Sequence, residues 1–385
     1  MTFCTKCLNL VTHNLPYPPD NGGLMDIYYK LKSFSECGMD VILHSFNYNN
    51  RTIKEINKYC KVVNLYERKF NPLLWFSLKP FIVNSRRSSK LLQNLIQNEH
   101  PILFDTLHTT FFLSHKILNN RKKFVRTHNV EHIYYKKLSE SAHHIGKKFY
   151  YFSESVKLKN YENILSFSNG IFAISLYEKI HFNQYAPTLI IPPFHPVQFN
   201  PGKDVENFAL YHGNLSVEEN QKAVEWLIDD IWQDKRIKNI PLVISGNGAP
   251  TWLKNKIYNS SNIKLLDKLK TEDILALVSK ARLNVLPTFQ NTGVKLKLIV
   301  ALGLGHHIVV NKLMTEGTGL EGVVPEATDS EEFIENIILC WNQKKVSSHI
   351  LAKRENLFAQ YLNNNHNALL MINYIFKNNN NSFIY

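Results

Sequence analysis

Short apolar runs alternate with longer amphipathic stretches along most of the chain. The short runs are rich in Val, Ile, Leu and Phe, as buried strands are, and the longer stretches repeat apolar residues at helical spacing. This alternation predicts an α/β protein with parallel sheets whose strands are joined by crossover helices. The expected strands are residues 8–13, 40–46, 61–66, 101–106, 123–128 and 170–175, followed by 207–213, 241–248, 263–266, 282–288 and 306–311.

A proline-rich stretch, residues 185–202, interrupts this alternation, and we place a domain boundary there. A chain of 385 residues is long enough for two domains, each with its own core. We therefore expect two doubly wound, Rossmann-like domains that face each other across a cleft, with ligands at the carboxyl ends of the strands. The predicted domains are 1–190 and 191–365, and residues 366–385 form a last helix and an Asn-rich tail.

The composition is that of a globular protein, because 44% of the residues are hydrophobic and no apolar run approaches the roughly 18 residues that span a bilayer. No signal-peptide pattern is evident. Cys4 and Cys7 are expected to be reduced strand cysteines. These features predict a cytoplasmic protein.

The net charge of +13 suits nucleic acid, an anionic membrane surface or phosphorylated substrates. Nucleic-acid-binding signatures are absent from the sequence, so we expect no nucleic acid partner. Aromatic residues lie among basic ones at 71–90 and 134–159, which suits a peripheral position at the inner face of the cytoplasmic membrane. Core aromatics beside solvated lysines would give the same composition, and that interpretation stays open.

Two stretches of the first half are candidates for a site. Gly22 and Gly23 follow the first strand in "YPPDNGG", where they would let a ligand approach a helix N-terminus, although an ordinary turn has the same sequence. In "RTHNVEH", Arg126, His128 and Glu131 follow a strand end, and we expect them to face the cleft as catalytic groups.

Histidines in these stretches have plainer interpretations as well. His128 could be a hydrogen-bonded loop residue. His128 and His132 could bind a metal from one helix face, but no third ligand has fitting spacing, so we expect no metal. Asp105 and His108 follow another strand and are weaker candidates, for which the interpretation as ordinary loop residues is favoured.

The second half begins with a similar pattern. Gly213 and Asn214 end the strand in "YHGNLS", and Gly246 ends the next one in "SGNG", so these residues are candidates for binding a donor molecule. Ser216 and Glu219 have the spacing of a helix-capping box, which explains them without a ligand.

The stretch 291–311 is the most informative. Thr292 and Gly293 are expected to begin a helix whose free N–H groups suit a diphosphate, with Val294 beside them. Lys295 in the first turn is unfavourable at the positive end of a helix, which indicates an anionic ligand. Lys297 lies about 200° further round the helix, so we interpret it as a solvated lysine.

One more stretch, "MTEGTGLEG", follows the strand after this helix. Glu316 and Gly317 would lie near the same cleft, where a carboxylate could accept hydrogen bonds from ribose hydroxyls. A flexible, solvated glycine loop has the same composition, so both interpretations stand.

In this order, the five stretches resemble the retaining nucleotide-sugar glycosyltransferases of family 4, which have the GT-B fold. The resemblance covers nearly the whole chain. It implies transfer of a hexose from a nucleotide diphosphate sugar to a glycan or lipid-linked glycan acceptor, as in bacterial surface-polysaccharide synthesis. It also implies retention of configuration, a donor substrate in place of any cofactor, no essential metal, and a sugar pocket lined by His128.

The chain departs from that family at its two motif glutamates, whose positions are Thr292 and Val300. Lys295 matches a basic residue of one branch of the family, and Glu316 is the candidate for the ribose partner. Two other functions therefore remain open. One is a non-catalytic GT-B protein that binds a glycan or a partner, and the other is a sugar-nucleotide epimerase, for which Glu131 and Glu316 are the available carboxylates.

Overall fold

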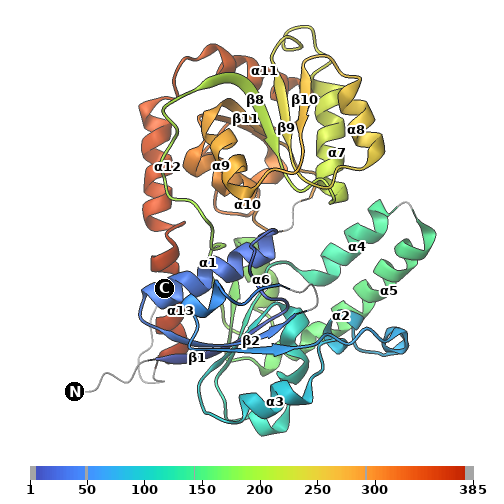
Figure 1. Cartoon of the computed structure of the whole chain (residues 1–385), viewed down its shortest axis with the longest axis vertical. Helices are drawn as coiled ribbons and strands as arrows, with labels where there is room; N and C mark the ends of the chain where they lie inside the picture. The colour runs from blue at the N-terminus through green and yellow to red at the C-terminus, as the bar shows by residue number, and fades with distance from the viewer. Residues whose placement is uncertain (1–5, 48–50, 143, 291–292, 378–385) are drawn as a thin grey trace. The chain divides into compact units, whose positions relative to one another are not determined.

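The structure is a computed structural model of the chain that describes residues 6–47, 51–142, 144–290 and 293–377. The chain divides into two compact units (Figure 1). Unit 1 consists of Met1–Phe194 and Asn363–Tyr385, and unit 2 is His195–Leu362. The division falls after residue 194 rather than 190, and the C-terminal segment belongs to unit 1 rather than standing apart.

Unit 1 is built on a parallel sheet with the strand order β3-β2-β1-β4-β5-β6-β7. This is the Rossmann order with one strand added at an edge. The strands are β1 (Cys7–Thr12), β2 (Asp40–Phe46), β3 (Val62–Tyr66), β4 (Ile102–Asp105), β5 (Lys123–Arg126), β6 (Gly170–Ala173) and β7 (Thr188–Ile190).

The helices of unit 1 cover both faces of this sheet. They are α1 (Gly22–Glu36), η1 (Ile56–Lys58), η2 (Pro72–Phe76), α2 (Phe81–Asn84), α3 (Ser89–Leu95), η3 (Leu107–Phe112), η4 (Lys116–Leu118), α4 (Glu131–Ser141), α5 (Ile145–Tyr161), η5 (Glu162–Phe167), α6 (Leu176–Phe182) and α13 (Asn364–Phe376). Successive residues of a strand alternate between the faces, so Leu103 packs in one core and Phe104 in the other.

Helix α1 shows how the sequence specifies one of these elements. Asn21 caps its N-terminus by accepting a hydrogen bond from the Leu24 backbone N–H at 3.1 Å. Leu24, Ile27 and Leu31 recur at helical spacing and pack into the core that α1 shares with α13, which lies beside it in Figure 1. Gly38, with φ of 74°, follows the end of the helix.

Unit 2 repeats the plan with the order β10-β9-β8-β11-β12-β13, again parallel. Its strands are β8 (Glu206–His212), β9 (Leu242–Ser245), β10 (Ile263–Leu266), β11 (Ala281–Leu286), β12 (His307–Asn311) and β13 (Glu326–Ala327). Its helices are α7 (Glu218–Trp226), η6 (Leu227–Ile231), α8 (Thr251–Tyr258), α9 (Thr271–Lys280), α10 (Leu296–Leu304), η7 (Lys312–Met314), α11 (Ser330–Asn342) and α12 (Ser348–Gln360).

The predicted fold class of two doubly wound, parallel α/β units is confirmed. Each expected strand is present, within a few residues at its ends. Two short edge strands, β7 and β13, were not predicted. The 185–202 stretch was interpreted as a break in the pattern, yet it contains β7. Pro187 immediately precedes β7 at the sheet edge, where a missing N–H is tolerated.

Candidate functional site

The carboxyl ends of β1, β4 and β5 bring a polar cluster together in unit 1. His13 follows β1, Asp105 ends β4, and His128 follows β5 by two residues. Strands β1 and β4 are neighbours whose crossovers run in opposite directions, which is the point where doubly wound sheets bind their ligands. We call the group Asp26, Lys30, Asp105, Arg126 and His128 the carboxylate cluster.

Two buried carboxylates form the centre of the carboxylate cluster. Asp26 and Lys30 lie one turn apart on α1, and the Lys30 ammonium lies 3.0 Å from Asp26 and also pairs with Asp105. The His128 Nε2 atom lies 3.2 Å from a carboxylate oxygen of each aspartate. The Arg126 guanidinium donates to Asp26 at 2.8 Å. The two aspartates are therefore neutralised on every side, as buried charges must be.

The carboxylates favour the charged form of His128. Burial by itself lowers the pKa of His128, but Asp105 and then Asp26 outweigh it and raise this pKa to about 9. Burial likewise raises the pKa of Asp105, while Lys30 and His128 bring it down to about 2. At neutral pH the cluster therefore holds three cations against two anions, and the excess charge suits an electron-rich ligand.

Further polar groups lie around His128. A Cβ atom at Gly23 would lie 3.5 Å from the Nδ1 atom of His128 and 3.6 Å from the His13 ring, so the glycine keeps this side of both rings open. His108 stacks edge-on against His13 with ring centroids 6.1 Å apart, and its Nε2 atom lies 3.2 Å from Glu131. Burial, then Arg86 and His108, hold the pKa of His13 well below its ordinary range, so His13 is neutral.

The position of Arg126 differs from the predicted one. The sequence places Arg126 with His128 and Glu131 as a group facing a ligand, but the Arg126 side chain is fully buried. Its guanidinium donates to Asp26 and to the backbone carbonyls of Ile191 and Pro192. Arg126 therefore holds Asp26 in place, whereas His128 is partly exposed. Glu131 is mostly buried as the first residue of α4.

A second polar cluster lies at the equivalent position of unit 2, after β8 and β11. The Lys295 ammonium lies 3.4 Å from Glu219 on α7, and Thr288 donates a hydrogen bond to the same carboxylate. Ser216 and Glu219 were interpreted as a capping box, which is wrong, because α7 starts at Glu218 and has no side-chain cap. The Ser216 hydroxyl instead donates to Asn214 at 2.7 Å.

Lys297 belongs to this second cluster, and its interpretation as a solvated lysine is wrong. Its ammonium donates to the Tyr211 hydroxyl at 3.2 Å and to the Asn220 side-chain oxygen at 3.0 Å, and it lies over the Tyr211 ring. Burial lowers the pKa of Lys297 to about 8, with Glu219 opposing the shift and Lys295 adding to it. Because Lys295 lowers the pKa of Lys297, the two lysines belong to the same cluster.

Lys297 was misplaced because the helix begins later than expected. Helix α10 starts at Leu296, Lys295 is its N-cap residue, and Gly293 lies before it with φ of 67°. Thr292, a predicted donor residue, lies outside the described residues. Val294 packs against the unit 2 core, and Val300 is buried in that core, as its apolar side chain predicts.

The glycines of unit 2 have a packing role. A Cβ atom at Gly246 would lie 1.9 Å from the Gly213 carbonyl oxygen, so only glycine allows these two strand ends to meet. At Gly213 itself, a Cβ atom would be 3.2 Å from the Asn220 side chain. The Asn220 amide in turn donates to the Asn214 carbonyl at 2.9 Å. These three predicted donor residues therefore shape the strand-end loops beside Asn220 of α7, whose side-chain oxygen holds Lys297 of α10.

The remaining predicted donor residues follow β12. Glu316 is exposed, and its backbone N–H donates to the Lys312 carbonyl at 3.0 Å. Gly317 adopts φ of 74°, a conformation that favours glycine. The part played by Glu316 toward a ribose stays a prediction.

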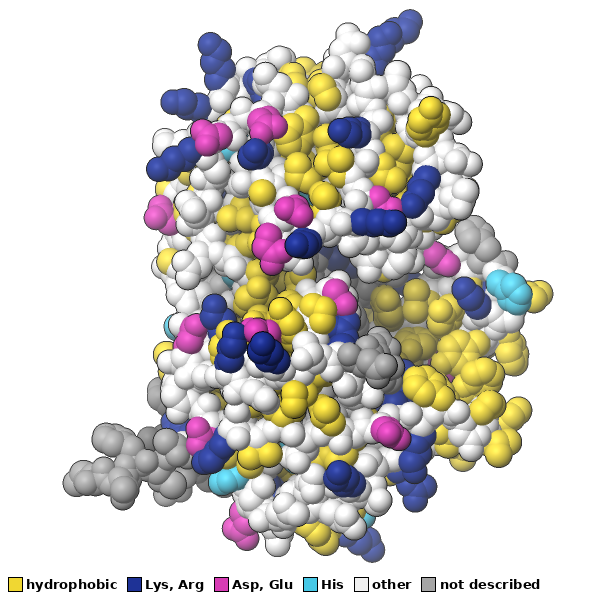
Figure 2. All heavy atoms as spheres, in the orientation of Figure 1, with side chains coloured by type: hydrophobic (Ala, Val, Ile, Leu, Met, Phe, Trp, Pro, Cys, Tyr) yellow, Lys and Arg dark blue, Asp and Glu magenta, His cyan; other side chains and the backbone are white. Residues whose placement is uncertain are grey.

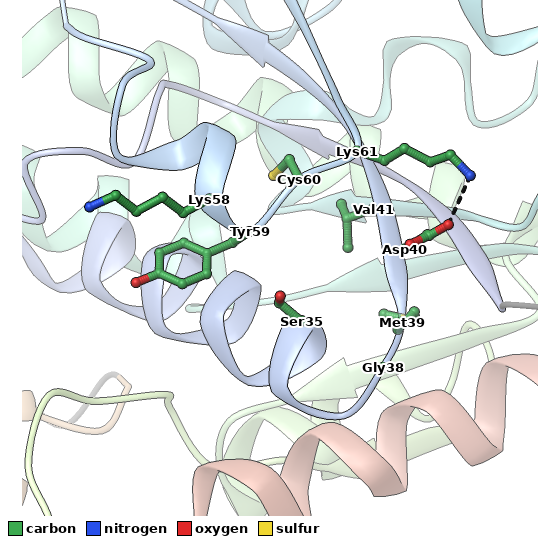
Figure 3. A pocket seen from close by; sticks show the side chains of 9 residues that line it. All are labelled: Ser35, Gly38, Met39, Asp40, Val41, Lys58, Tyr59, Cys60 and Lys61. Carbon is green, nitrogen blue, oxygen red and sulfur yellow. Dashed lines mark hydrogen bonds and ion pairs between the residues drawn. The ribbon is translucent and has the colours of Figure 1, made fainter.

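One open pocket lies away from these clusters. It has a volume of about 460 Å³ and is lined by Ser35, Gly38–Val41 and Lys58–Lys61, with Lys61 and Asp40 paired across 2.9 Å (Figure 3). These residues lie at the amino ends of β2 and β3. Doubly wound sheets bind their ligands at the opposite edge, so we do not assign the chemistry to this pocket.

His128 and His132 do not share one group of ligand atoms. His128 meets Asp26 and Asp105, whereas His132 lies with Glu162 and His181. The sequence contained no fitting spacing for either group, because their members come from elements far apart in the chain.

Three residues around His128 were not predicted as part of a site. His13 follows β1 as His128 follows β5, so its position at a strand end was a readable signal. Asp26 and Lys30 carry opposite charges four residues apart on a helix face that is otherwise apolar, which is also a signal. Asp105 was noticed but interpreted as an ordinary loop residue.

Comparisons with known proteins bear on the fold and on the class of the protein. Residues 206–343, most of unit 2, match the family model of the glycosyl transferases group 1. An uncharacterised 44.6 kDa protein in the cps region of Klebsiella pneumoniae is 28% identical over 394 residues, which covers 96% of this chain and 99% of that protein.

Among solved structures, a point mutant of S. aureus TarM in complex with fondaparinux, alpha-GlcNAc-glycerol and UDP superposes with a TM-score of 0.66 at 12% identity, covering 97% of this chain and 100% of that one. Anabaena Alr3699/HepE in complex with UDP gives 0.62 at 14% identity, covering 96% and 99%. The chain has the GT-B fold. Together with the family match over unit 2, this fold indicates a glycosyltransferase.

The carboxylate cluster predicts a pH-dependent stability. The pKa of His128 rises from about 6.5 in an unfolded chain to about 9 in the folded one. Its stabilisation is therefore complete below about pH 6.5 and is lost as the pH rises toward 9, by at most about 3 kcal/mol. Urea denaturation measures the free energy of unfolding. We expect the wild type to be more stable than His128→Gln by a larger margin at pH 6 than at pH 9. An equal difference at both pH values would show that His128 carries no extra proton.

Proposed function

We propose that this protein transfers a hexose from a nucleotide diphosphate sugar to a hydroxyl group of a glycan or a lipid-linked glycan, with retention of the anomeric configuration. The acceptor oxygen forms a bond to the anomeric carbon as the bond from that carbon to the diphosphate breaks. The diphosphate leaves with the bonding electron pair and, because both groups lie on one face of the sugar, it receives the hydroxyl proton.

The observation that carries this proposal is the pair of lysines at the start of α10. Lys297 is held by Tyr211 and Asn220, so its ammonium is already positioned before a ligand arrives. Lys295 and the first free N–H groups of α10 add positive potential beside it. A departing diphosphate gains charge as its bond to the sugar breaks, and prepositioned cations stabilise it most at that stage.

The proposed role of unit 1 is a hydrogen bond from His128 to the sugar. Its imidazolium is held between two ionised carboxylates, and its Nδ1 side faces Gly23. A charged N–H in this setting can donate a strong hydrogen bond to a sugar oxygen. The protein does not need to supply a general base, because the leaving diphosphate itself accepts the proton.

The relatives support the same class of donor. TarM and HepE form complexes with UDP, and one HepE structure contains UDP-glucose. The Klebsiella relative is described only by its cps region, which fits a role in polysaccharide synthesis.

One observation favours a second candidate, a non-catalytic GT-B protein that binds a glycan or a partner. Glu219 occupies the place beside Lys295 where a phosphate would bind, and its carboxylate already neutralises that lysine. Val300 also replaces a motif carboxylate. The first candidate requires the diphosphate to bind mainly through Lys297 and to displace Glu219 from Lys295.

Transfer assays with a panel of nucleotide diphosphate sugars test the activity. We expect one donor to be hydrolysed or transferred, and His128→Ala to lower its turnover by about tenfold or more with little change in nucleoside diphosphate affinity. The exposed His349 provides the control, since His349→Ala should retain wild-type rates. Unchanged kinetics in His128→Ala would remove His128 from the site.

Calorimetry with nucleoside diphosphates tests the two lysines. A charge-assisted contact contributes about 1.5 to 3 kcal/mol, so Lys297→Ala should weaken binding by about tenfold or more. Lys295→Ala should have a smaller effect, because Glu219 already pairs with that lysine. Affinity should also fall as the pH rises above about 8, because Lys297 loses its proton there in the free protein.

The control for this experiment is Lys264→Ala, which changes an exposed lysine on the edge strand β10. Nucleoside affinity should change far less than diphosphate affinity in Lys297→Ala. If both lysine variants bind diphosphates as wild type does, the phosphate assignment is wrong.

We also propose that unit 1 binds an anionic membrane surface. Figure 2 shows hydrophobic side chains gathered in the region of α5. On α5, Ile145, Phe149, Phe152 and Val156 recur along one helix face and are exposed. Trp75 of η2 contacts Tyr150 with ring centroids 5.8 Å apart, so the exposed side chains of η2 continue this surface.

The exposed residues of the η2 stretch include Phe76 at 88% and Leu78 at 95%, larger fractions than isolated surface residues need. Exposed lysines border the surface, among them Lys69, Lys79, Lys147 and Lys148. Arg86, which was predicted to be one of the membrane-facing cations, is buried and donates to backbone carbonyls. No helix in the described part of the chain is long and apolar enough to cross a membrane.

Vesicle sedimentation tests this surface. Wild type should bind vesicles with anionic lipid more strongly than neutral ones, since each basic residue near the surface contributes on the order of 1 kcal/mol. Phe76→Ser with Phe149→Ser should reduce binding to both kinds of vesicle, and Lys147→Gln with Lys148→Gln should remove part of the preference. Leu339→Ser, at an exposed leucine of unit 2, is the control. Equal, weak binding to both vesicles would end the proposal.

A further inference from the structure

A second buried carboxylate of unit 1 lies outside the carboxylate cluster. Glu162 is the first residue of η5 and is almost completely buried. One of its oxygens lies 2.7 Å from His132 Nδ1 in the first turn of α4, and the other lies 2.9 Å from His181 Nε2 on α6. Three separate helical elements thus meet at this carboxylate.

In the part of the chain that the structure describes, Glu162 forms no ion pair with a lysine or an arginine. In the described residues, the ion pairs of Glu162 are both with histidines, whose ordinary pKa lies near 6.5. The other buried carboxylates of unit 1 that form ion pairs include Asp26 and Glu154, and each of these two pairs with a lysine or arginine.

The geometry is that of a set of metal ligands. The two imidazole nitrogens and a carboxylate oxygen lie within 4.8 Å of one another. Zinc takes His and Glu ligands at about 2.0–2.2 Å, which puts the ligand atoms of a tetrahedral site roughly 3.3 Å apart. The two histidine–carboxylate contacts, at 2.7 and 2.9 Å, would each lengthen by about half an ångström in such a site.

Access to the group is also suitable. The side chains of His132 and His181 are 16% and 21% exposed, so an ion can enter from solvent and keep a water as its fourth ligand. Backbone contacts hold the first histidine in place, since Ser155 on α5 donates to the His132 carbonyl at 2.7 Å.

The group of Asp26, Asp105 and His128 has ligand atoms at similar separations, but its charges argue against a metal. Lys30 and Arg126 already neutralise both aspartates, so a divalent ion would add two charges to a cluster with excess positive charge. The ligand atoms of the two groups are similarly spaced, but their charges differ, and only the group of His132, Glu162 and His181 suits a metal ion.

We propose that His132, Glu162 and His181 bind a divalent transition metal ion of the zinc type. Two imidazoles and one carboxylate favour zinc and its neighbours over magnesium or calcium. The ion joins α4, η5 and α6, and so fixes the first turn of α4, which follows directly from the His128 loop. Its role is structural, and it does not depend on the proposed transferase activity.

Metal titration of the whole protein tests this site. After removal of bound ions by a chelator, zinc is added in competition with a chromophoric chelator, and Co²⁺ serves as a spectroscopic substitute. We expect about one equivalent of zinc to bind, and to raise the thermal unfolding temperature, because the ion binds only the folded site. His181→Gln and His132→Gln should each weaken binding by at least about tenfold.

Two variants serve as controls. His349→Gln changes an exposed histidine on α12, and His128→Gln changes the other candidate group, so both should bind zinc as wild type does. Circular dichroism confirms folding, and Glu162→Gln provides a third ligand variant of unchanged shape. The proposal would be overturned if the double variant His132→Gln with His181→Gln still binds zinc, or if His128→Gln loses zinc binding. A wild type that binds no zinc would overturn it as well.

Discussion

The ion network around Asp26 and Asp105 holds the functional edge of unit 1 together. Asp26 on α1 receives Arg126 from β5 and the Phe194 backbone N–H at 2.9 Å, and the Arg126 guanidinium also donates to the Ile191 and Pro192 carbonyls. One carboxylate thus joins a helix, a strand end and the last segment of unit 1 before residue 195. Removing one partner from a buried ion network typically costs about 3–5 kcal/mol, because the remaining charge is left unpaired.

The same network determines the chemistry of His128. Without the two carboxylates, burial would leave this imidazole neutral, as it leaves His13. Lys297 of unit 2 shows the opposite effect, because burial beside Tyr211 and Asn220 lowers its pKa to about 8. His128 and Lys297 both lie where neighbouring crossovers of a doubly wound sheet run in opposite directions. The fold therefore explains where these two residues lie, and the side chains around them explain their charge.

The architecture could be predicted because apolar runs and amphipathic stretches report burial directly. Strand β7 was missed because it is short and follows Pro187 within a stretch that resembles a linker. His128 was found by its position after a strand, and the same rule would have found His13. The pairing of Lys297 with Tyr211 could not be found in this way, because the two residues are 86 positions apart. The helix was also expected to begin at Thr292 and Gly293, whereas α10 begins at Leu296, and the position of Lys297 around the helix was therefore wrong.

Whether the protein binds a nucleotide donor is the central question. Val300 is buried in the unit 2 core and its side chain offers no hydrogen bond to a ribose, so we expect the diphosphate to supply most of the affinity for a donor. The most direct measurement is a calorimetric titration of the wild-type chain with several nucleoside diphosphates and the matching nucleosides. We expect at least one diphosphate to bind about tenfold or more tightly than its nucleoside. If no diphosphate binds, or if each nucleoside binds as well as its diphosphate, the protein does not hold a nucleotide donor in this way.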